Sequence, residues 1–502
     1  MESASRAANS VADGVSAKYD TGSAKRRTPT RPDVTLALAG LTAFAVAAGI
    51  YIWYALTHRM PDWMEPVDLR VYRFGGFIAA HVRPLYQAHR GAPLYDWPGF
   101  HSLKFTYTPF AALVFTAATI LPLQLLEYTS LAVNTVATLL AVWVVLAAVG
   151  WPGGGSAASQ GRSGVPSIPR RAGLTLLVGA AVFWLEPVQR TLFLGQVELI
   201  LMALIMWDLC QPDRRWWKGA GVGVAAGIKL VPLIFIPYLL LTRRFRQAAV
   251  AAGTFVLTAL IGFAVDPADS TRWWLGGLFV KGSRTGFVGW EGNQSLLGLI
   301  TRLTGSVAAG QRLWIWAGLA VVVVGLAAAV LLDRAGHPVV GILTCALTGV
   351  LASPISWDHH WVWAVPAVVA AVGYAIRSRG ALRLAAAGLA IAITGVFFAW
   401  PGGLWGEPND LGGFSLGLIW APPNTNPGTY YRLGDRPWFA EYHWHGLQLL
   451  SGNLYVLTGM GLLTLLAGIS LWCTRHRPVA ARQASPTALT RSRTGAQSVS
   501  TS

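Results

Sequence analysis

Residues 34–56, VTLALAGLTAFAVAAGIYIWYAL, contain no charged side chain. A helix needs about 20 apolar residues to cross a bilayer, so this stretch predicts a membrane-spanning helix rather than a cleavable signal. Lys25, Arg26, Arg27 and Arg31 precede it. Because basic residues are retained on the cytoplasmic side, the N-terminus is expected inside the cell.

The composition extends this interpretation to the whole chain. The 502 residues are 54% hydrophobic and 12% charged, with a mean hydropathy of +0.47, whereas soluble proteins carry about 25% charged residues. The net charge of +17 lies largely in the tails and between apolar runs, which indicates membrane topology and no nucleic-acid partner. Cys210, Cys345 and Cys473 show neither a metal-binding spacing nor an obvious disulfide pairing.

Further apolar runs follow the first one along the chain. They occupy residues 109–121, 128–149, 172–185, 192–207, 219–242, 248–265, 313–332, 338–354, 361–376, 384–400 and 454–473. Two of them are ambiguous, because 109–121 is too short to cross and 219–242 is interrupted by Lys229 and Pro232. The basic connectors all fall on the cytoplasmic side if 109–121 is a re-entrant helix and 219–242 is a tilted hairpin of two short helices.

This arrangement places basic connectors on one side of the membrane. They contain Arg162, Arg170, Arg171, Arg214, Arg215, Lys218, Arg243, Arg244, Arg246, Arg334, Arg377, Arg379 and Arg383. The sequence therefore predicts an all-α polytopic membrane protein with twelve spans. Residues 34–473 form one transmembrane domain, and 1–33 and 474–502 are expected to be disordered cytoplasmic tails.

The opposite connectors are 57–127, 186–191, 266–312, 355–360 and 401–453, and four of these five carry polar motifs. Asp68 opens the first of them, in PVDLRVY (66–72), which continues as a weakly amphipathic stretch to Tyr86. It is either a solvated loop acid or a general base at the membrane surface, where a carboxylate near an acceptor hydroxyl contributes about 10²–10⁴-fold to the rate.

Aromatic and amide side chains accompany the acid. FTYTPF (105–110) opens the re-entrant helix with a proline, which suits a helix start, and its aromatic rings suit a lipid-facing groove. The segment from Glu186 to Glu198 is expected to be a tight outer turn between two spans. Ionisable groups at this depth are costly, so either Glu186 and Arg190 pair internally, or Arg190 or Gln196 binds a phosphate or sugar.

Lys229 is the intramembrane lysine, placed at the apex of the predicted hairpin. It either snorkels to the interface or neutralises an anionic head group, and anion binding is the favoured interpretation. Asn293-Gln294-Ser295 matches a glycosylation sequon, although polar ligand contacts are as plausible for these residues.

SPISWDHHW (353–361) is the densest polar cluster between two apolar runs. Neighbouring residues on a helix point apart, and no third His or Cys lies nearby in sequence, so no metal site is expected. Hydrogen bonds from His359 and His360 to a sugar or phosphate fit the cluster better.

Taken in order, these motifs resemble glycosyltransferase family 87, the polyprenyl-phosphate-mannose-dependent α-mannosyltransferases with a GT-C fold. The resemblance rests on the segments at 67–72, 105–110, 186–187, 195–196, 227–230, 293–295 and 353–361. The family often has a second proline where this chain has Thr108. Residues 401–453 do not resemble the family's motifs, so the resemblance does not identify the acceptor.

The resemblance implies an inverting transfer of mannose from a polyprenyl phosphate to a hydroxyl of a phosphatidylinositol mannoside or related envelope lipid, with an α-(1→2)-type linkage. Asp68 would be the catalytic base and His359 or His360 the functionally important histidine. No cofactor is implied, since the lipid-linked sugar is a donor substrate. The site would face outward from the plasma membrane. The residues expected to bind substrate are Tyr72, Tyr107, Arg190, Gln196, Lys229, Arg284, Asn293, Gln294 and Trp357.

Two other functions remain open from the sequence. A secondary transporter or lipid flippase would place its binding groups near the membrane midplane at broken helices, with internal repeats that are not evident here. A membrane acyltransferase would use His359 or His360 deep in a tunnel and would leave Asp68 without a role.

Overall fold

The computed structural model describes residues 29–57, 66–81, 85–86, 104–151, 167–280, 284, 286–400, 416–423 and 439–476. Within these ranges the chain is helical and has no β-strand, only isolated bridges between Leu185 and Phe398 and between Asn293 and Trp357. Most of the two predicted tails, 1–28 and 477–502, lies outside the described residues, as do 58–65, 87–103, 401–415 and 424–438 of the predicted outer loops.

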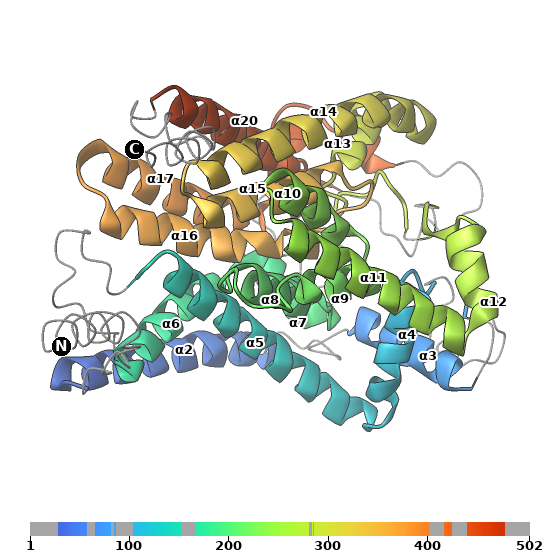
Figure 1. The fold of residues 1–502 in the computed structure, drawn as a ribbon, viewed down its shortest axis with the longest axis horizontal. Coiled ribbons are helices and arrows are strands. Elements are labelled where there is room, and N and C mark those ends of the chain that lie inside the picture. The colour runs from blue at the N-terminus through green and yellow to red at the C-terminus, as the bar shows by residue number, and fades with distance from the viewer. Residues whose placement is uncertain are drawn as a thin grey trace, which may run out of the picture.

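The helices follow one another along the chain as Figure 1 shows. They are α2 (Arg31–Thr57), α3 (Val67–Ala80), α4 (Pro109–Phe115), η1 (Thr116–Thr119), α5 (Leu123–Ala148), α6 (Ile168–Val182), α7 (Glu186–Leu194), α8 (Glu198–Leu209), α9 (Ala220–Ile228), η3 (Val231–Ile234), α10 (Phe235–Leu241), α11 (Phe245–Val265), α12 (Pro267–Ser270), η4 (Thr271–Leu275), η5 (Leu278–Val280), α13 (Leu296–Thr304), α14 (Val307–Arg334), α15 (Pro338–Ala352), η7 (Asp358–Trp363), α16 (Ala364–Arg377), α17 (Gly380–Phe397), η8 (Leu418–Trp420), η9 (Ala440–His443), α19 (Leu447–Ser451) and α20 (Leu454–Arg475).

Seven helical segments in the described part are long and apolar enough to cross a membrane, namely α2, α5, α11, α14, η7 with α16, α17 and α20. They confirm the prediction of an all-α polytopic membrane protein. Shorter apolar helices occur at 109–119, 231–241 and 338–352. The count of twelve spans and the re-entrant placement of 109–119 remain predictions.

The run 219–242 folds as the predicted hairpin. A Cβ on Gly219 would lie 3.1 Å from the backbone nitrogen of Ala251, and one on Gly227 would lie 2.7 Å from the Cβ of Thr258. Helix α9 therefore runs parallel to α11 and approaches it closely. The chain breaks at Lys229 and returns through η3 and α10 to the end where α11 begins.

Adding a methyl group at this close contact is expected to disturb the hairpin. Gly227→Ala should lower the thermal unfolding temperature, because overpacking typically costs about 1–3 kcal/mol. Gly253→Ala in α11 is the matched control, since a Cβ there meets nothing within 4 Å. Thermal unfolding of both purified variants checks this, and equal stability would show that α9 does not pack on α11 as described.

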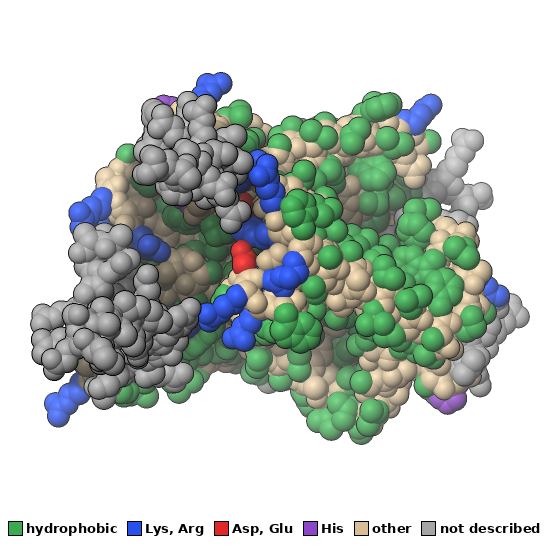
Figure 2. Space-filling view, viewed as in Figure 1, with side chains coloured by type: hydrophobic (Ala, Val, Ile, Leu, Met, Phe, Trp, Pro, Cys, Tyr) green, Lys and Arg blue, Asp and Glu red, His purple; other side chains and the backbone are tan. Residues whose placement is uncertain are grey.

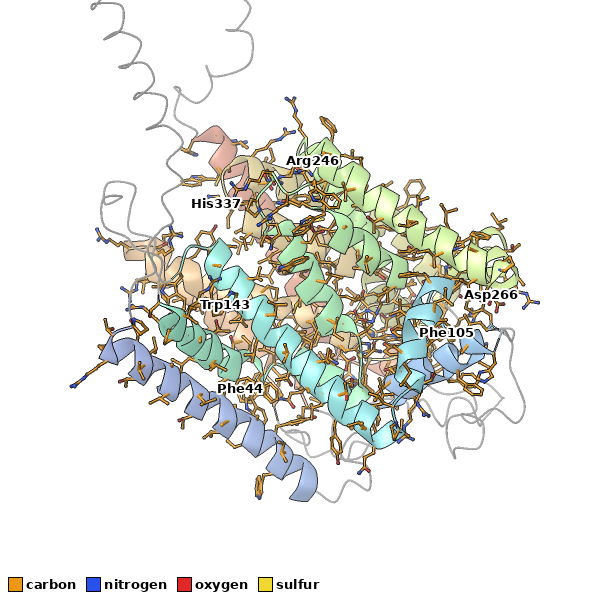
Figure 3. The ribbon with its side chains drawn as sticks, turned by 60° about the horizontal axis from the view of Figure 1, so that its bottom comes forward. Phe44, Phe105, Trp143, Arg246, Asp266 and His337 are labelled. Atoms are coloured by element: carbon orange, nitrogen blue, oxygen red, sulfur yellow. The ribbon has the colours of Figure 1, made fainter. Side chains whose placement is uncertain are left out.

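The basic connectors gather at one end of the bundle. Arg244 forms a two-point ion pair with Asp333 at 2.6 and 3.1 Å, and Arg334 donates to the Leu241 carbonyl at 2.8 Å. Figure 2 shows most of the Lys and Arg side chains on this face in its left half, and mainly hydrophobic side chains in its right half. In Figure 3, Arg246 and His337 mark this end and Phe105 and Asp266 the other.

Two predicted outer connectors are more regular than expected. Asp68 was expected in a loop, but it lies in the first turn of α3. The segment from Glu186 to Glu198 was expected to be a tight turn, but its first part forms α7 (Glu186–Leu194), whose buried face includes Val188, Leu192 and Phe193. An apolar stripe on a short helix lets it pack against the bundle where a solvated turn would not.

Candidate active site

Helix α3 positions Asp68 and Tyr72 on one face, because residues four apart on a helix lie one above the other. The Tyr72 hydroxyl lies 2.8 Å from that of Tyr107 and donates to the side-chain amide oxygen of Gln196, which is also 3.3 Å from the Tyr107 hydroxyl. Three segments far apart in the sequence therefore meet beside the acid, as predicted.

Lys229 caps the C-terminal end of α9: its backbone N–H still donates to the Ala225 carbonyl at 2.9 Å, but its own extended backbone ends the helix at the break of the α9–α10 hairpin. Its ammonium contacts the Glu198 carboxylate and lies 2.8 Å from His360 Nε2 and 5.8 Å from the centre of the Tyr107 ring. An ammonium can only donate, so His360 accepts at Nε2 and is neutral.

His359 faces a different set of partners. Its Nδ1 lies 3.0 Å from Asp358 Oδ1, and Asp358 Oδ2 lies 3.2 Å from Arg190 Nε. The Asp358 and Arg190 side chains are 3% and 11% exposed. Among the described residues, His359 Nε2 is buried without a hydrogen-bond partner. Arg190 thus holds Asp358, and Asp358 orients His359 with its second nitrogen free.

The Asp68 carboxyl lies within this cluster. Burial raises its pKa above the ordinary value of 3.8, while His359, a hydrogen bond from Gln196, Lys229 and Arg190 act in the opposite direction. The acid and the His359 imidazole are therefore close enough to interact electrostatically. A carboxyl with a raised pKa is a stronger base than a solvated one.

The remaining predicted residues contact other protein groups. Arg284 donates to the Phe105 carbonyl at 3.0 Å. The Asn293 side chain joins Val288 and Ser356, while the Gln294 amide donates to the carbonyls of Glu291 and Gly452. The Trp357 ring lies 5.5 Å from that of Trp290. Their role in substrate binding remains a prediction.

One geometric expectation about the histidines is wrong. His359 and His360 were expected to diverge, but they lie in a tight 3-10 turn with ring centres 4.7 Å apart. Together with Glu198 they place three ligand atoms within 4.8 Å of one another, an arrangement that could hold a metal ion. Lys229 already contacts Glu198 and His360, so the group contains its own cation.

Glu198, Asp358 and Glu186 were not predicted as site residues, although all three are buried. Glu186 accepts from Tyr455 at 2.8 Å and Trp420 at 3.2 Å, so it does not form the internal pair with Arg190 that the sequence left open. Buried carboxylates are rare unless paired. The position of these three carboxylates in apolar stretches of the sequence could have marked them as site residues. Their partners lie too far away along the chain to be inferred from the sequence.

An apolar cavity begins at the Lys229 cluster. Glu198, Lys229, Ser356 and His360 form its polar part. The rest is lined by side chains from α8, the η3–α10 segment, α15 and the η7–α16 region, namely Leu201, Met202, Ile205, Val231, Pro232, Ile234, Phe235, Ala346, Val350, Val362 and Trp363. The cavity therefore offers charge at one part and hydrocarbon contacts elsewhere, which suits a lipid with a polar head.

The helical membrane bundle and this polar site beside an apolar cavity define a polytopic membrane protein with a candidate active site. The sequence profile of Glycosyltransferase family 87 matches residues 105–354. The chain is 32% identical over 371 residues (72% of this chain, 81% of the relative) to a polyprenol-phosphate-mannose-dependent alpha-(1-2)-phosphatidylinositol mannoside mannosyltransferase of Mycolicibacterium smegmatis. The chain belongs to glycosyltransferase family 87, as the motifs predicted.

Two further relatives extend this similarity. Over 442 residues the chain is 32% identical to a polyprenol-phosphate-mannose-dependent alpha-(1-2)-phosphatidylinositol pentamannoside mannosyltransferase of Mycolicibacterium smegmatis, covering 87% of this chain and 95% of the relative. It is 30% identical over 349 residues (68% and 79%) to a Mycobacterium tuberculosis protein with the same name as the first relative. No solved structure matches the chain.

Proposed function

We propose that this chain transfers mannose from polyprenyl-phosphate-mannose to a hydroxyl of a phosphatidylinositol mannoside or related envelope lipid, forming an α-(1→2)-type linkage. The names of its relatives support the donor, the acceptor class and the linkage. The observation that carries the proposal is the Asp68 carboxyl, gathered with Lys229 and His359 next to an apolar cavity.

The proposed reaction inverts the anomeric carbon. The acceptor oxygen forms a bond to this carbon on the face opposite the phosphate, while the carbon–oxygen bond to the phosphate breaks. Asp68 accepts the hydroxyl proton. A phosphate leaving group needs no general acid, only positive charge, which Lys229 supplies at the polar part of the cavity.

The other predicted residues support binding in this proposal. Tyr72, Tyr107 and Gln196 offer hydroxyl and amide groups for sugar hydroxyls, and His359 offers its free Nε2. Arg190 acts through Asp358 rather than by touching the phosphate. Arg284, Asn293 and Gln294 hold the neighbouring loops in place through hydrogen bonds to backbone carbonyls, and Trp357 packs against Trp290.

The proposed orientation follows from charge. The end of the bundle that holds Arg244, Arg246 and Arg334 faces the cytoplasm of a plasma-membrane protein, as basic connectors do. The Asp68 end then faces outward, with both tails inside. No cofactor or metal is needed, because Lys229 provides the charge next to Glu198 and His360.

Transfer should depend on pH through Asp68. The base acts only when ionised, so the rate falls as the pH drops through its pKa. Since burial raises that pKa above 3.8, the acidic limb is expected above that pH. His359 is the largest influence that lowers the pKa, so His359→Gln should move the limb upward. Initial rates across pH check this, and a limb at or below pH 3.8 would contradict it.

The proposal is tested by incubating the purified protein with labelled polyprenyl-phosphate-mannose and a panel of envelope glycolipids. Transfer of label to a phosphatidylinositol mannoside, in a linkage cleaved by an α-mannosidase, is the expected result. Guanosine-diphosphate mannose is the control donor and should give no product. Absence of transfer to every acceptor from a folded protein would overturn the proposal.

A lipid flippase remains the second candidate, because Lys229 sits at a helix break inside the bundle, as transporter binding groups do. Reconstituted vesicles with a fluorescent polyprenyl phosphate distinguish the two. Movement of the lipid between leaflets without sugar transfer would favour this candidate.

A further inference from the structure

The contact between Glu198 and Lys229 has no role in the transfer described above. Both side chains line the cavity, and they are 9% and 18% exposed. Glu198 Oε1 also lies 3.5 Å from His360 Nε2. A carboxylate thus occupies the position beside Lys229 and His360 that an anionic head group would take.

This carboxylate has a second source of stabilisation. Glu198 is the first residue of α8, which has 12 residues. Negative charge is favourable in the first turn of a helix, where unpaired backbone amides and the helix dipole are available. The Glu198 carboxylate can therefore separate from Lys229 and remain stabilised by the N-terminal end of α8.

We propose that Glu198 is the resident anion of the donor-phosphate site: it pairs with Lys229 while the site holds no phosphate, and it displaces polyprenyl phosphate after the transfer. This inference rests on the proposed function and adds a specificity-determining residue to it. The exchange makes and breaks only ion pairs, so no proton or electron is consumed.

The charges of substrate and product give the exchange a direction. The sugar-linked donor is a phosphodiester with one negative charge. The released lipid is a phosphomonoester, which carries about −1.5 to −2 at pH 7. A site with Lys229 and no competing carboxylate would hold the product more tightly than the donor. Glu198 repels the more highly charged product more strongly and so favours its release.

The test compares the inhibition constant of polyprenyl phosphate with the donor KM in unchanged protein and Glu198→Gln. We expect the inhibition constant to fall about tenfold, equivalent to about 1.4 kcal/mol, with a smaller fall in donor KM and a lower kcat. Glu198→Asp, which keeps the charge on a shorter side chain, should lie between. Asp213→Asn at the opposite end is the control for removing a carboxylate and should change nothing.

A purely structural ion pair predicts a different outcome. Glu198→Gln would then lower stability and kcat without tightening the product, and an unchanged or weaker inhibition constant in a folded variant overturns the inference. If both Glu198 variants fail to fold, a structure of the unchanged protein with bound polyprenyl phosphate tests whether the phosphate displaces Glu198 from Lys229. Lys229 should contact the phosphate and lie more than about 4 Å from Glu198, beyond ion-pair distance, whereas a persistent contact overturns the inference.

The two proposals fail separately. A folded protein that transfers no mannose overturns the proposed function, and direct binding of polyprenyl phosphate to unchanged protein and Glu198→Gln then decides the role of Glu198. Normal transfer with no change in product inhibition overturns only the role of Glu198.

Discussion

Asp68→Asn is expected to reduce mannosyl transfer by about 10²–10⁴-fold, the usual contribution of a general base, while the protein stays folded. The substitution keeps the size of the side chain but removes its ability to accept the hydroxyl proton. Asp68 lies in the first turn of α3 and makes no ion pair shorter than 4.0 Å among the described residues, so its loss should not open the bundle. Initial rates at saturating donor, together with thermal unfolding, measure both effects.

Asp213→Asn is the matched control, because Asp213 pairs with Lys218 at the opposite end of the bundle and is 59% exposed. This control should retain the rate of the unchanged protein. Near-normal turnover by Asp68→Asn would reject its assignment as the base. An unfolded Asp68→Asn protein would show that the carboxylate is structural.

Arg190→Met is expected to cause the largest loss of stability. It leaves Asp358 buried without its main counter-charge, and breaking a buried ion pair costs about 3–5 kcal/mol. The orientation of His359, which Asp358 holds at 3.0 Å, should also be lost. Thermal unfolding in detergent should show a large fall in midpoint, accompanied by a lower rate of transfer.

Arg170→Met provides the comparison at an exposed pair. Arg170 is 46% exposed and lies 3.7 Å from Asp33, so its loss should cost about 0–1 kcal/mol. The double variant Arg190→Met with Asp358→Asn should recover part of the stability, because the unpaired charge is removed. Equal midpoints for Arg190→Met and Arg170→Met would contradict the buried pair.

The membrane class and the hairpin could be predicted because they depend on local properties. Apolar runs of sufficient length specify helices in lipid. Lys229 and Pro232 interrupt the run 219–242 at its middle, and the basic connectors required both ends of that run on the same side. The close approach of Gly227 to Thr258 agrees with this prediction.

The convergence of the polar motifs was also predictable, whereas their pairing was not. Charge placed the connectors with Asp68, Lys229 and His359 at one end, and the structure brings these residues together. The partners Glu198 and Asp358 were missed, because contacts between Lys229 and Glu198 or between Arg190 and Asp358 depend on how distant helices pack. No sequence periodicity reports such packing.

Local regularity was underestimated in the polar segments. The first turn of α3 contains Asp68 and the helix α7 contains Arg190, yet both were predicted as loop or turn. Short helices at the ends of a bundle are stabilised by packing rather than by length. The turn at His359 and His360 also departs from the helix expected there. It has a tight 3-10 geometry, which we attribute to the packing of η7 against its neighbours.

The most direct measurement is a structure of the Asp68→Asn variant with polyprenyl-phosphate-mannose and an acceptor glycolipid, since this variant should stall with both substrates bound. The acceptor hydroxyl should lie within hydrogen-bond distance of the residue 68 side chain, with the phosphate against Lys229 and the lipid chain in the apolar cavity. A sugar bound away from residue 68, or an empty cavity beside Lys229, would contradict the account.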